Sequence, residues 1–463
     1  MAPKPPTFGA PRQSRGAPRS TRGSDGLLRR CACWALLALA VVVTPVVASG
    51  DSATSVRRER LPNGLTVIVR ENPLAPVVAV SLMVETGSRW ERPDNAGISN
   101  FLHAVMVRGT TKRNGSELAE KIAAIGGKLS ASGDVDYSEI RATALARFWR
   151  DLLDLTAELA LEPRLAPVDV DDERQFLLSR IQRRRDNPSS RAFDELYRAL
   201  YDGHPYALPS IGTPESLPRI DHAAIVARYR EVYRPGRMVL AVSGQVSAAE
   251  VLADVRRLFG GLPGGTRAAD GHLAPPVAAK RRVVIEQPAQ QVQFLIGALA
   301  PTIDHHDHAA VKVLSTVLGG GMAGRLFSEL RDRRGLAYTA TSYYDAVREP
   351  GALVLYLGTA PDNATRAEEA LLAEVARIRD EAIGDAELTR AKGYLLGRDA
   401  MDRRTNERQA WYLAFYDLER VGADFPERYR RAVAAVTVSD VQRVARRYLA
   451  TLTTLVLRPP EPR

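Results

Sequence analysis

The alternation of apolar and polar residues after position 48 predicts a chain of strands and helices. Asn63 and Gly64 supply the backbone angles of a tight turn before a β-branched run, so residues 60–70 are predicted to form a hairpin. An apolar run predicts a strand at 77–84, and apolar positions at helical spacing predict a helix from about 96 to 107. The same criteria predict helices at 145–161, 171–184 and 221–233, followed by a strand at 238–243.

The order of elements then repeats. Strands are predicted at 283–285 and 293–298 and a helix at 309–318, and the chain closes with a helix at 439–448 and a strand at 452–457. The repetition predicts a duplicated α+β unit, in which each copy is an antiparallel sheet with helices packed on one face. The predicted boundaries are a first domain at 49–262, a linker rich in Gly, Pro and Ala at 263–280, and a second domain at 281–463.

Residues 1–48 are predicted to be a signal peptide. The apolar stretch 34–48 follows Arg29 and Arg30, ends in small residues, and is shorter than the ~20 residues that a membrane-spanning helix needs. We therefore expect cleavage after Ala48 and a periplasmic or secreted protein with no stable membrane span. The alternative is a leader that is retained as an anchor.

Composition narrows the function further. The formal charge of +10 includes +6 from residues 1–48, and aromatic residues make up only 6% of the chain, so nothing favours nucleic-acid binding. Both cysteines, Cys31 and Cys33, lie in the predicted leader. The mature chain therefore has neither a disulfide nor a thiolate metal site, and a Cys–His enzyme is excluded.

The segment 85–91, ETGSRWE, and the segment 97–110, GISNFLHAVMVRGT, resemble the N-terminal signature of the pitrilysin and insulinase family, particularly its processing-peptidase branch. The resemblance extends over essentially all of the mature chain and implies a fold that forms half of a clam-like chamber. In active members the helix carries H-x-x-E-H, in which two histidines hold zinc and the glutamate activates water.

The resemblance places Asn100, His103 and Ala104 at the positions of the first histidine, the glutamate and the second histidine. The family's third ligand is a glutamate seven residues after a Glu-Arg pair, and here Glu173 and Arg174 are followed by Arg180. Catalytic zinc usually has three protein ligands, and none of the expected three is present. The sequence thus predicts no metal site and no catalytic residue in this chain, with zinc expected in a partner subunit.

Two other metal-site readings are open but disfavoured. His103 and Glu173 could form a rebuilt site, but they lack a third ligand, and we favour a polar network in which Glu173 and Arg180 fill the old pocket. Residues 304–308, DHHDH, could also hold a metal, although they lie where a helix begins, and there Asp caps free N–H groups.

The second half retains an element that the resemblance associates with substrate. Family members carry an arginine and, seven residues later, a tyrosine that contact the peptide near the bond to be cut, and Arg331 and Tyr338 match both the residue types and the spacing. A guanidinium and a phenol can hold a peptide carbonyl. The short run Gly319–Gly321 does not match a phosphate-binding loop. It can be interpreted either as a loop that contacts substrate or as a flexible turn.

Taken together, these features predict a secreted, non-catalytic subunit of a heterodimeric zinc metallopeptidase. It would bind extended peptides and complete the chamber of a zinc-bearing homologue. One alternative is an inactive homodimer that binds peptides as a chaperone-like module, and a second is an active peptidase with a nonstandard metal site. The natural substrate and the identity of the partner are not determined by the sequence.

Overall fold

The computed structural model describes residues 55–267 and 273–460, which all lie within one compact unit. The predicted signal peptide, both cysteines and part of the predicted linker lie outside these ranges. None of the helices in the described ranges has the length and apolar character that crossing a bilayer requires.

The first sheet has six strands in the order β1-β2-β6-β3-β5-β4, and its pairs are antiparallel except for the parallel pair β2 and β6. The predicted hairpin and both predicted strands of this half are present. The strands are β1 (Val56–Arg60), β2 (Thr66–Glu71), β3 (Val77–Val84), β4 (Lys128–Gly133), β5 (Ser138–Leu145) and β6 (Met238–Gly244).

The second sheet has five strands in the order β7-β11-β8-β10-β9, and β7 and β11 are its parallel pair. The predicted α+β class is confirmed, with the difference that one parallel pair makes each sheet mixed rather than purely antiparallel. The strands are β7 (Arg281–Glu286), β8 (Val292–Ala300), β9 (Thr339–Asp345), β10 (Gly351–Thr359) and β11 (Thr453–Arg458).

Thirteen α-helices lie in the described ranges, together with a π-helical segment at Leu326–Arg333. The helix predicted at 145–161 begins only at Trp149, because Leu145 still belongs to β5 and a single 3₁₀ turn follows it. In the first half the helices are α1 (Ile98–Met106), α2 (Gly115–Ala124), α3 (Trp149–Leu161), α4 (Pro167–Asp186), α5 (Pro188–Leu200), α6 (His222–Val232) and α7 (Ala248–Phe259). In the second half they are α8 (His308–Gly319), α9 (Ala364–Asp380), α10 (Asp385–Asp402), α11 (Asn406–Leu418), α12 (Phe425–Ala435) and α13 (Val438–Tyr448).

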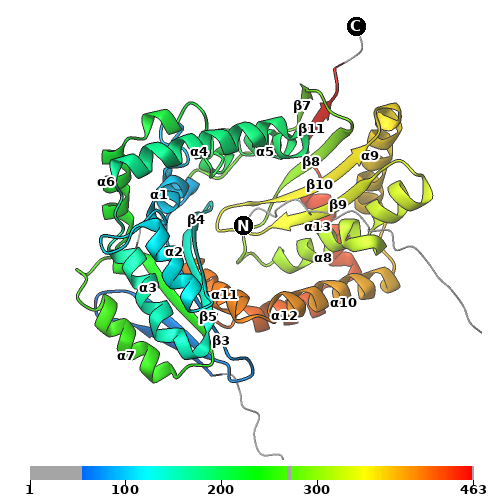
Figure 1. The fold of residues 1–463 in the computed structure, drawn as a ribbon. Coiled ribbons are helices and arrows are strands. Elements are labelled where there is room, and N and C mark those ends of the chain that lie inside the picture. Colours follow the sequence, from blue (N-terminus) through cyan, green and yellow to red (C-terminus); the bar gives the residue numbers. More distant parts are fainter. Residues whose placement is uncertain (1–54, 268–272, 461–463) are drawn as a thin grey trace, which may run out of the picture. The chain divides into compact units, whose positions relative to one another are not determined.

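Each sheet is also covered by a helix from the other half. Helix α5 contacts β8 and β11 of the second sheet, whereas α11 contacts β3 and β6 of the first (Figure 1). The strands have apolar residues on both faces, as in β3, where Val78 and Val80 pack with α1 and α3 while Ala79 and Met83 belong to the cluster that contains α11. The prediction of helices on one face was therefore incomplete, because the second face of each sheet is buried by an exchanged helix.

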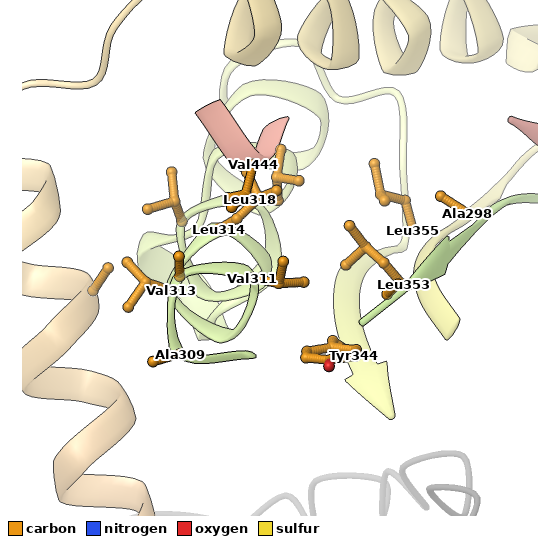
Figure 2. Packing of buried hydrophobic residues seen from close by; sticks show 14 of the residues in the cluster. Ala298, Ala309, Val311, Val313, Leu314, Leu318, Tyr344, Leu353, Leu355 and Val444 are labelled. Atoms are coloured by element: carbon orange, nitrogen blue, oxygen red, sulfur yellow. The ribbon is translucent and has the colours of Figure 1, made fainter. Parts of the chain in front are cut away.

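In the second half, α8 occupies the position that α1 has in the first. Figure 2 shows Val311 and Leu314 of α8 across from Leu353 and Leu355 of β10, with Val444 of α13 close to the helix. All five of these side chains are fully buried. The helix that corresponds to α1 is thus held as an apolar core element.

Candidate functional site

Helix α1, where the family has its zinc motif, begins at a sharply turned glycine. Gly97 has φ of 91°, a conformation that favours glycine, and the Glu91 carboxylate accepts hydrogen bonds from the N–H groups of Gly97 (2.7 Å) and Ser99 (2.9 Å). This carboxylate satisfies N–H groups that the first turn leaves unpaired. Burial raises the pKa of Glu91, and its hydrogen bonds oppose that shift.

Asn100 and Ala104 lie four residues apart on a half-buried face of α1, beside the edge strand β4. The Gly133 N–H donates to Asn100 Oδ1 at 3.4 Å, and a Cβ at Gly133 would lie 2.8 Å from Asn100 Cα. The helix therefore packs directly against the backbone of β4. The backbone places these two side chains on one helix face, but an amide and a methyl group are not zinc ligands.

His103 is fully buried, and both nitrogens of its ring are hydrogen-bonded. Nδ1 lies 2.7 Å from the carbonyl oxygen of Ser99, and Nε2 lies 2.9 Å from the hydroxyl of Tyr233. A carbonyl only accepts, so Nδ1 carries the proton and Nε2 accepts from the tyrosine. Burial, opposed by the bond to Ser99 and assisted by nearby Arg228, lowers the pKa of His103 to about 4. The neutral imidazole has no lone pair free to bind a metal.

Glu173 of α4 is buried and bound by a cation from the end of α1. Its Oε2 accepts from Arg108 Nε at 2.9 Å and from Arg108 Nη2 at 2.5 Å. Arg180 is exposed and forms no ion pair with a described residue. The predicted network of Glu173 and Arg180 is therefore wrong in its second member, because Arg108 neutralises the carboxylate and Arg180 points to solvent two turns along α4.

Two residues of α6 and its C-terminal end also hold α1 in place, and the sequence did not indicate either of them. Arg228 of α6 donates through Nη2 to Thr86 Oγ1 at 2.8 Å and to Ser99 Oγ at 3.2 Å. Tyr233, at the end of the same helix, holds His103. Neither carries a sequence signal for this role, since both lie about 130 residues from their partners and have ordinary neighbours in the chain.

Arg331 and Tyr338 are both exposed side chains of the second half. Arg331 belongs to the π-helical segment and stacks over the Phe327 ring at 4.7 Å. Tyr338 comes just before β9, donates its N–H to Gly358 O at 2.9 Å, and has 59% of its surface exposed. Within the described ranges, no hydrogen bond joins these two side chains to each other or to α1. π-Helical segments are rare in proteins, and those that do occur are often found at functional sites.

The run Gly319–Gly321 is a packed turn. A Cβ at Gly319 would lie 1.9 Å from the backbone nitrogen of Ser342 in β9, and one at Gly320 would lie 2.5 Å from the carbonyl oxygen of Thr316. Only Gly321, with φ of 73°, requires the left-handed conformation. Gly319 therefore permits close packing of α8 on β9, whereas the sequence suggested a flexible turn.

His305, His306 and Asp307 place one possible ligand atom each within 4.8 Å of one another. However, His305 Nδ1 accepts the Asp307 N–H at 3.0 Å, and the Asp307 carboxylate accepts from Arg443 at 2.6 Å and from Tyr448 at 2.9 Å. Asp307 makes no side-chain cap of α8, contrary to the prediction, because its oxygens bind α13 instead. Because His305 Nδ1 and the Asp307 carboxylate already accept hydrogen bonds, and two arginines lie beside that carboxylate, the cluster does not suit a cation.

The described residues around α1 do not fit the family's zinc ion. Asn100 and Ala104 stand in place of two ligands, and Arg180 stands in place of the third. Both ring nitrogens of His103 are already hydrogen-bonded. Zinc-activated water, the chemistry that the ion supplies in active members, has no support from these groups. What remains accessible is a free sheet edge at β4 and the exposed Arg331 and Tyr338.

Comparison with known proteins agrees with this fold. The family model "Insulinase (Peptidase family M16)" matches residues 66–214, and "Peptidase M16 inactive domain" matches residues 219–395. The chain belongs to this peptidase family, M16, as the resemblance in the sequence implied. It is peptidase-like in fold and carries a degenerate form of the family's metal site.

Several relatives are similar along most of their length. An uncharacterized zinc protease of Mycobacterium leprae is 33% identical over 74% of this chain and 78% of its own, and one of Mycobacterium tuberculosis is 31% identical over 86% and 92%. A crystal structure of a protease from Helicobacter pylori has a TM-score of 0.81 at 22% identity and covers 88% of this chain and 100% of its own. A structure described as a peptidase M16 inactive domain from Pseudomonas fluorescens has the same TM-score at 23% identity, covering 88% and 98%. At these identities the two structures show the shared fold.

Proposed function

We propose that this chain is a non-catalytic subunit of a secreted or periplasmic zinc metallopeptidase. It pairs with a zinc-bearing homologue, binds extended peptides, and completes the chamber in which the partner cuts them. The observation that carries the proposal is the state of His103, because a buried neutral ring with both nitrogens hydrogen-bonded can neither bind zinc nor take the proton of an attacking water. Metal and base must then come from the other subunit.

The free edge of β4 supports peptide binding. This strand pairs with β5 on one side and with no described strand on the other, and α1 packs against it. An extended peptide can add a strand to such an edge, and its main-chain hydrogen bonds supply affinity without a fixed sequence. Lys128, Ser130 and Ser132 alternate with the inward Leu129 and Ala131, so the edge is polar toward solvent.

The exposed pair Arg331 and Tyr338 supports a second contact with the substrate. A cationic donor and a phenol that are accessible to solvent can bind a peptide carbonyl and stabilise the oxyanion that develops on it. In this proposal they act on a peptide held at the partner's metal. The localisation rests on the predicted leader at 1–48.

The proposal is tested by producing the chain alone and together with a zinc-motif homologue encoded by the same genome. We expect no peptide hydrolysis by the chain alone, and hydrolysis by the purified pair that a chelator abolishes. Arg331→Ala in the pair should reduce kcat/KM on the order of 100-fold, as loss of a donor to a developing oxyanion does, with the zinc content unchanged.

Arg333→Ala is the matched control, because Arg333 is exposed on the same segment and pairs only locally with Glu329 (2.6 Å). It should leave kcat/KM within about twofold of the wild type, as surface substitutions do. Hydrolysis by the chain alone with one bound zinc per molecule would refute the proposal. A stable homodimer that binds peptides without any partner would favour the chaperone-like alternative instead.

A further inference from the structure

A cluster of buried and half-buried polar side chains joins five segments where the two halves of the chain meet. Its members, which we call the junction cluster, come from the end of β3 and the following 3₁₀ turn, the β4–β5 turn, the 3₁₀ segment at Pro205–Ala207, the β9–β10 turn and the end of α11. They are Glu85, Arg89, Asp136, Tyr206, Arg348, Glu349 and Glu419.

Arg348 is the centre of this cluster. Its Nη1 donates to Glu85 Oε1 at 3.0 Å, and its Nη2 donates to the carbonyl oxygen of Leu418 at 2.5 Å. Its Nε lies 3.7 Å from Glu419 Oε2. One side chain from the β9–β10 turn therefore contacts both the end of β3 and the end of α11.

Two further contacts close the cluster on the other side. The Tyr206 hydroxyl donates to both oxygens of Asp136, at 2.6 and 2.8 Å, and Arg89 forms an ion pair with Glu349. Asp136 and Arg89 are buried residues of the first half, whereas Glu349 lies beside Arg348 in the second. The Tyr206 hydroxyl also accepts the Glu349 N–H at 3.4 Å, so Tyr206 connects the β4–β5 turn to the β9–β10 turn.

Burial raises the pKa of two carboxylates in the cluster, Asp136 and Glu419, and only Asp136 accepts hydrogen bonds from residues that the structure describes, which leaves Glu419 as the less well accommodated charge. Glu419 is 5% exposed, and neither carboxylate oxygen accepts a hydrogen bond from the described part of the chain. Burial raises its pKa to about 8, and the nearby Asp136 adds to the shift while Arg348 and Arg89 oppose it. The charged and titratable groups that face it are Glu85, Arg89, Asp136, Tyr206 and Arg348, and two further arginines, Arg267 and Arg420, lie against Glu85.

We propose that the junction cluster is a protonation-dependent clamp, closed when Glu419 holds its proton and opened when Glu419 releases that proton to solvent. Neither oxygen of Glu419 accepts a hydrogen bond from a described residue in the closed cluster, and the bare carboxylate would attract donors more strongly than the protonated group. Either water enters the cluster, or Arg348, whose Nε already lies 3.7 Å from Glu419 Oε2, moves from Glu85 toward Glu419. Both changes loosen the contact between the two turns.

The clamp acts at the end of one edge strand in each sheet. Strand β4 ends at Gly133, three residues before Asp136, and β9 ends at Asp345, three residues before Arg348. Strand β4 is one of the two edge strands of the first sheet, and β9 is one of the two edge strands of the second. Opening the clamp therefore changes how firmly the two edges are held relative to each other, and this inference stands independently of the proposed peptidase role.

The test is hydrogen–deuterium exchange of the full-length mature protein between pH 6.5 and 9.5, expressed as protection factors that remove the intrinsic pH dependence. In the wild type we expect protection of residues 134–137 and 345–350 to fall several-fold with a midpoint near pH 8. In Glu419→Gln, which cannot ionise, protection of both turns should stay high throughout this range.

Glu374→Gln is the matched control, because Glu374 is also buried and also has a raised pKa, but it lies on α9 and pairs with Arg377. It should keep the wild-type profile. If Glu419→Gln does not fold, Asp136→Asn serves instead and should shift the midpoint to lower pH, because it removes a negative neighbour. A wild-type profile that is flat, or one that Glu419→Gln reproduces, would overturn the clamp.

Discussion

At the residue scale, His103 illustrates how a reactive position becomes a structural one. The family uses this position for a carboxylate that activates water, whereas here the side chain bridges Ser99 of its own helix and Tyr233 of α6. A buried polar side chain is tolerated in a core when every donor and acceptor is paired. The helix has kept its place in the fold while the chemistry of its polar face has changed.

The buried His103 predicts a loss of stability in acid. Its pKa is near 4 in the folded chain and about 6.5 when unfolded, so the unfolded state binds the extra proton between these values. The free energy of unfolding should therefore fall as pH drops from 6.5 to 4, by about 3 kcal/mol more in the wild type than in His103→Gln. Urea unfolding of both proteins across this range measures the difference.

Gln is a suitable replacement because it can donate to Ser99 and accept from Tyr233 but does not titrate. Acidic groups that titrate in both proteins cancel in the comparison. Parallel stability curves for the two proteins between pH 6.5 and 4 would show that His103 is accessible to protons in the folded state, against the burial described above.

Part of this site could be predicted from residues alone. The sequence alone shows that Asn100, Ala104 and Arg180 are not zinc ligands, because side chains of these types do not provide a suitable ligand atom for zinc. The partners of His103 and Glu173 could not be predicted, because Tyr233 and Arg108 reach them through tertiary packing across about 130 and 65 residues of sequence. A spacing rule describes one helix face and carries no information about what a second helix places against it.

At the scale of elements, the close approach of α8 to β9 depends on a missing side chain. The helix predicted at 309–318 and the glycines after it are both present, whereas the sequence did not predict the strand β9 that follows. The distance between them was not predictable, because the backbone nitrogen of Ser342 occupies the space where a Cβ at Gly319 would lie.

Two glycine substitutions should accordingly have opposite effects. Gly319→Ala forces the backbone atoms of β9 and α8 apart. We therefore expect it to lower the free energy of unfolding by about 1–3 kcal/mol or more, the cost typical of overpacking. Gly393→Ala, in the middle of α10 with nothing within 4 Å of its Cβ position, should stabilise by about 0.5–1 kcal/mol through helix propensity. Thermal unfolding of both variants measures the two signs, and equal effects would contradict the packing argument.

At the scale of the whole molecule, the exchange of α5 and α11 binds the two sequence repeats into one unit. The repeat predicted two similar sheets, and both are present. It did not predict that Leu196 and Leu200 of α5 would cover the second sheet, or that Trp411 of α11 would donate to Tyr137 beside the first. Each half on its own would expose one apolar sheet face to water.

The halves should therefore not fold separately. Produced alone, residues 49–262 and 281–463 should lack a cooperative thermal transition, because each loses the helix that covers its second sheet face and exposes a large apolar surface. Mixed during refolding, they should elute together and recover a transition. Calorimetry and size-exclusion chromatography distinguish these outcomes, and two independently melting fragments would show that the exchanged helices are dispensable.

The sequence by itself determined the strands and helices that begin and end each half, the duplication, the family and the loss of zinc-binding residue types. These properties depend on residue chemistry and on the periods of local structure, both of which are written along the chain. Tertiary structure alone decided the partner of each buried polar group, the exchange of α5 and α11, and the gathering of Asp136, Arg348 and Glu419 at one junction. Those depend on which distant surfaces meet when apolar faces are buried, and a linear pattern does not specify that.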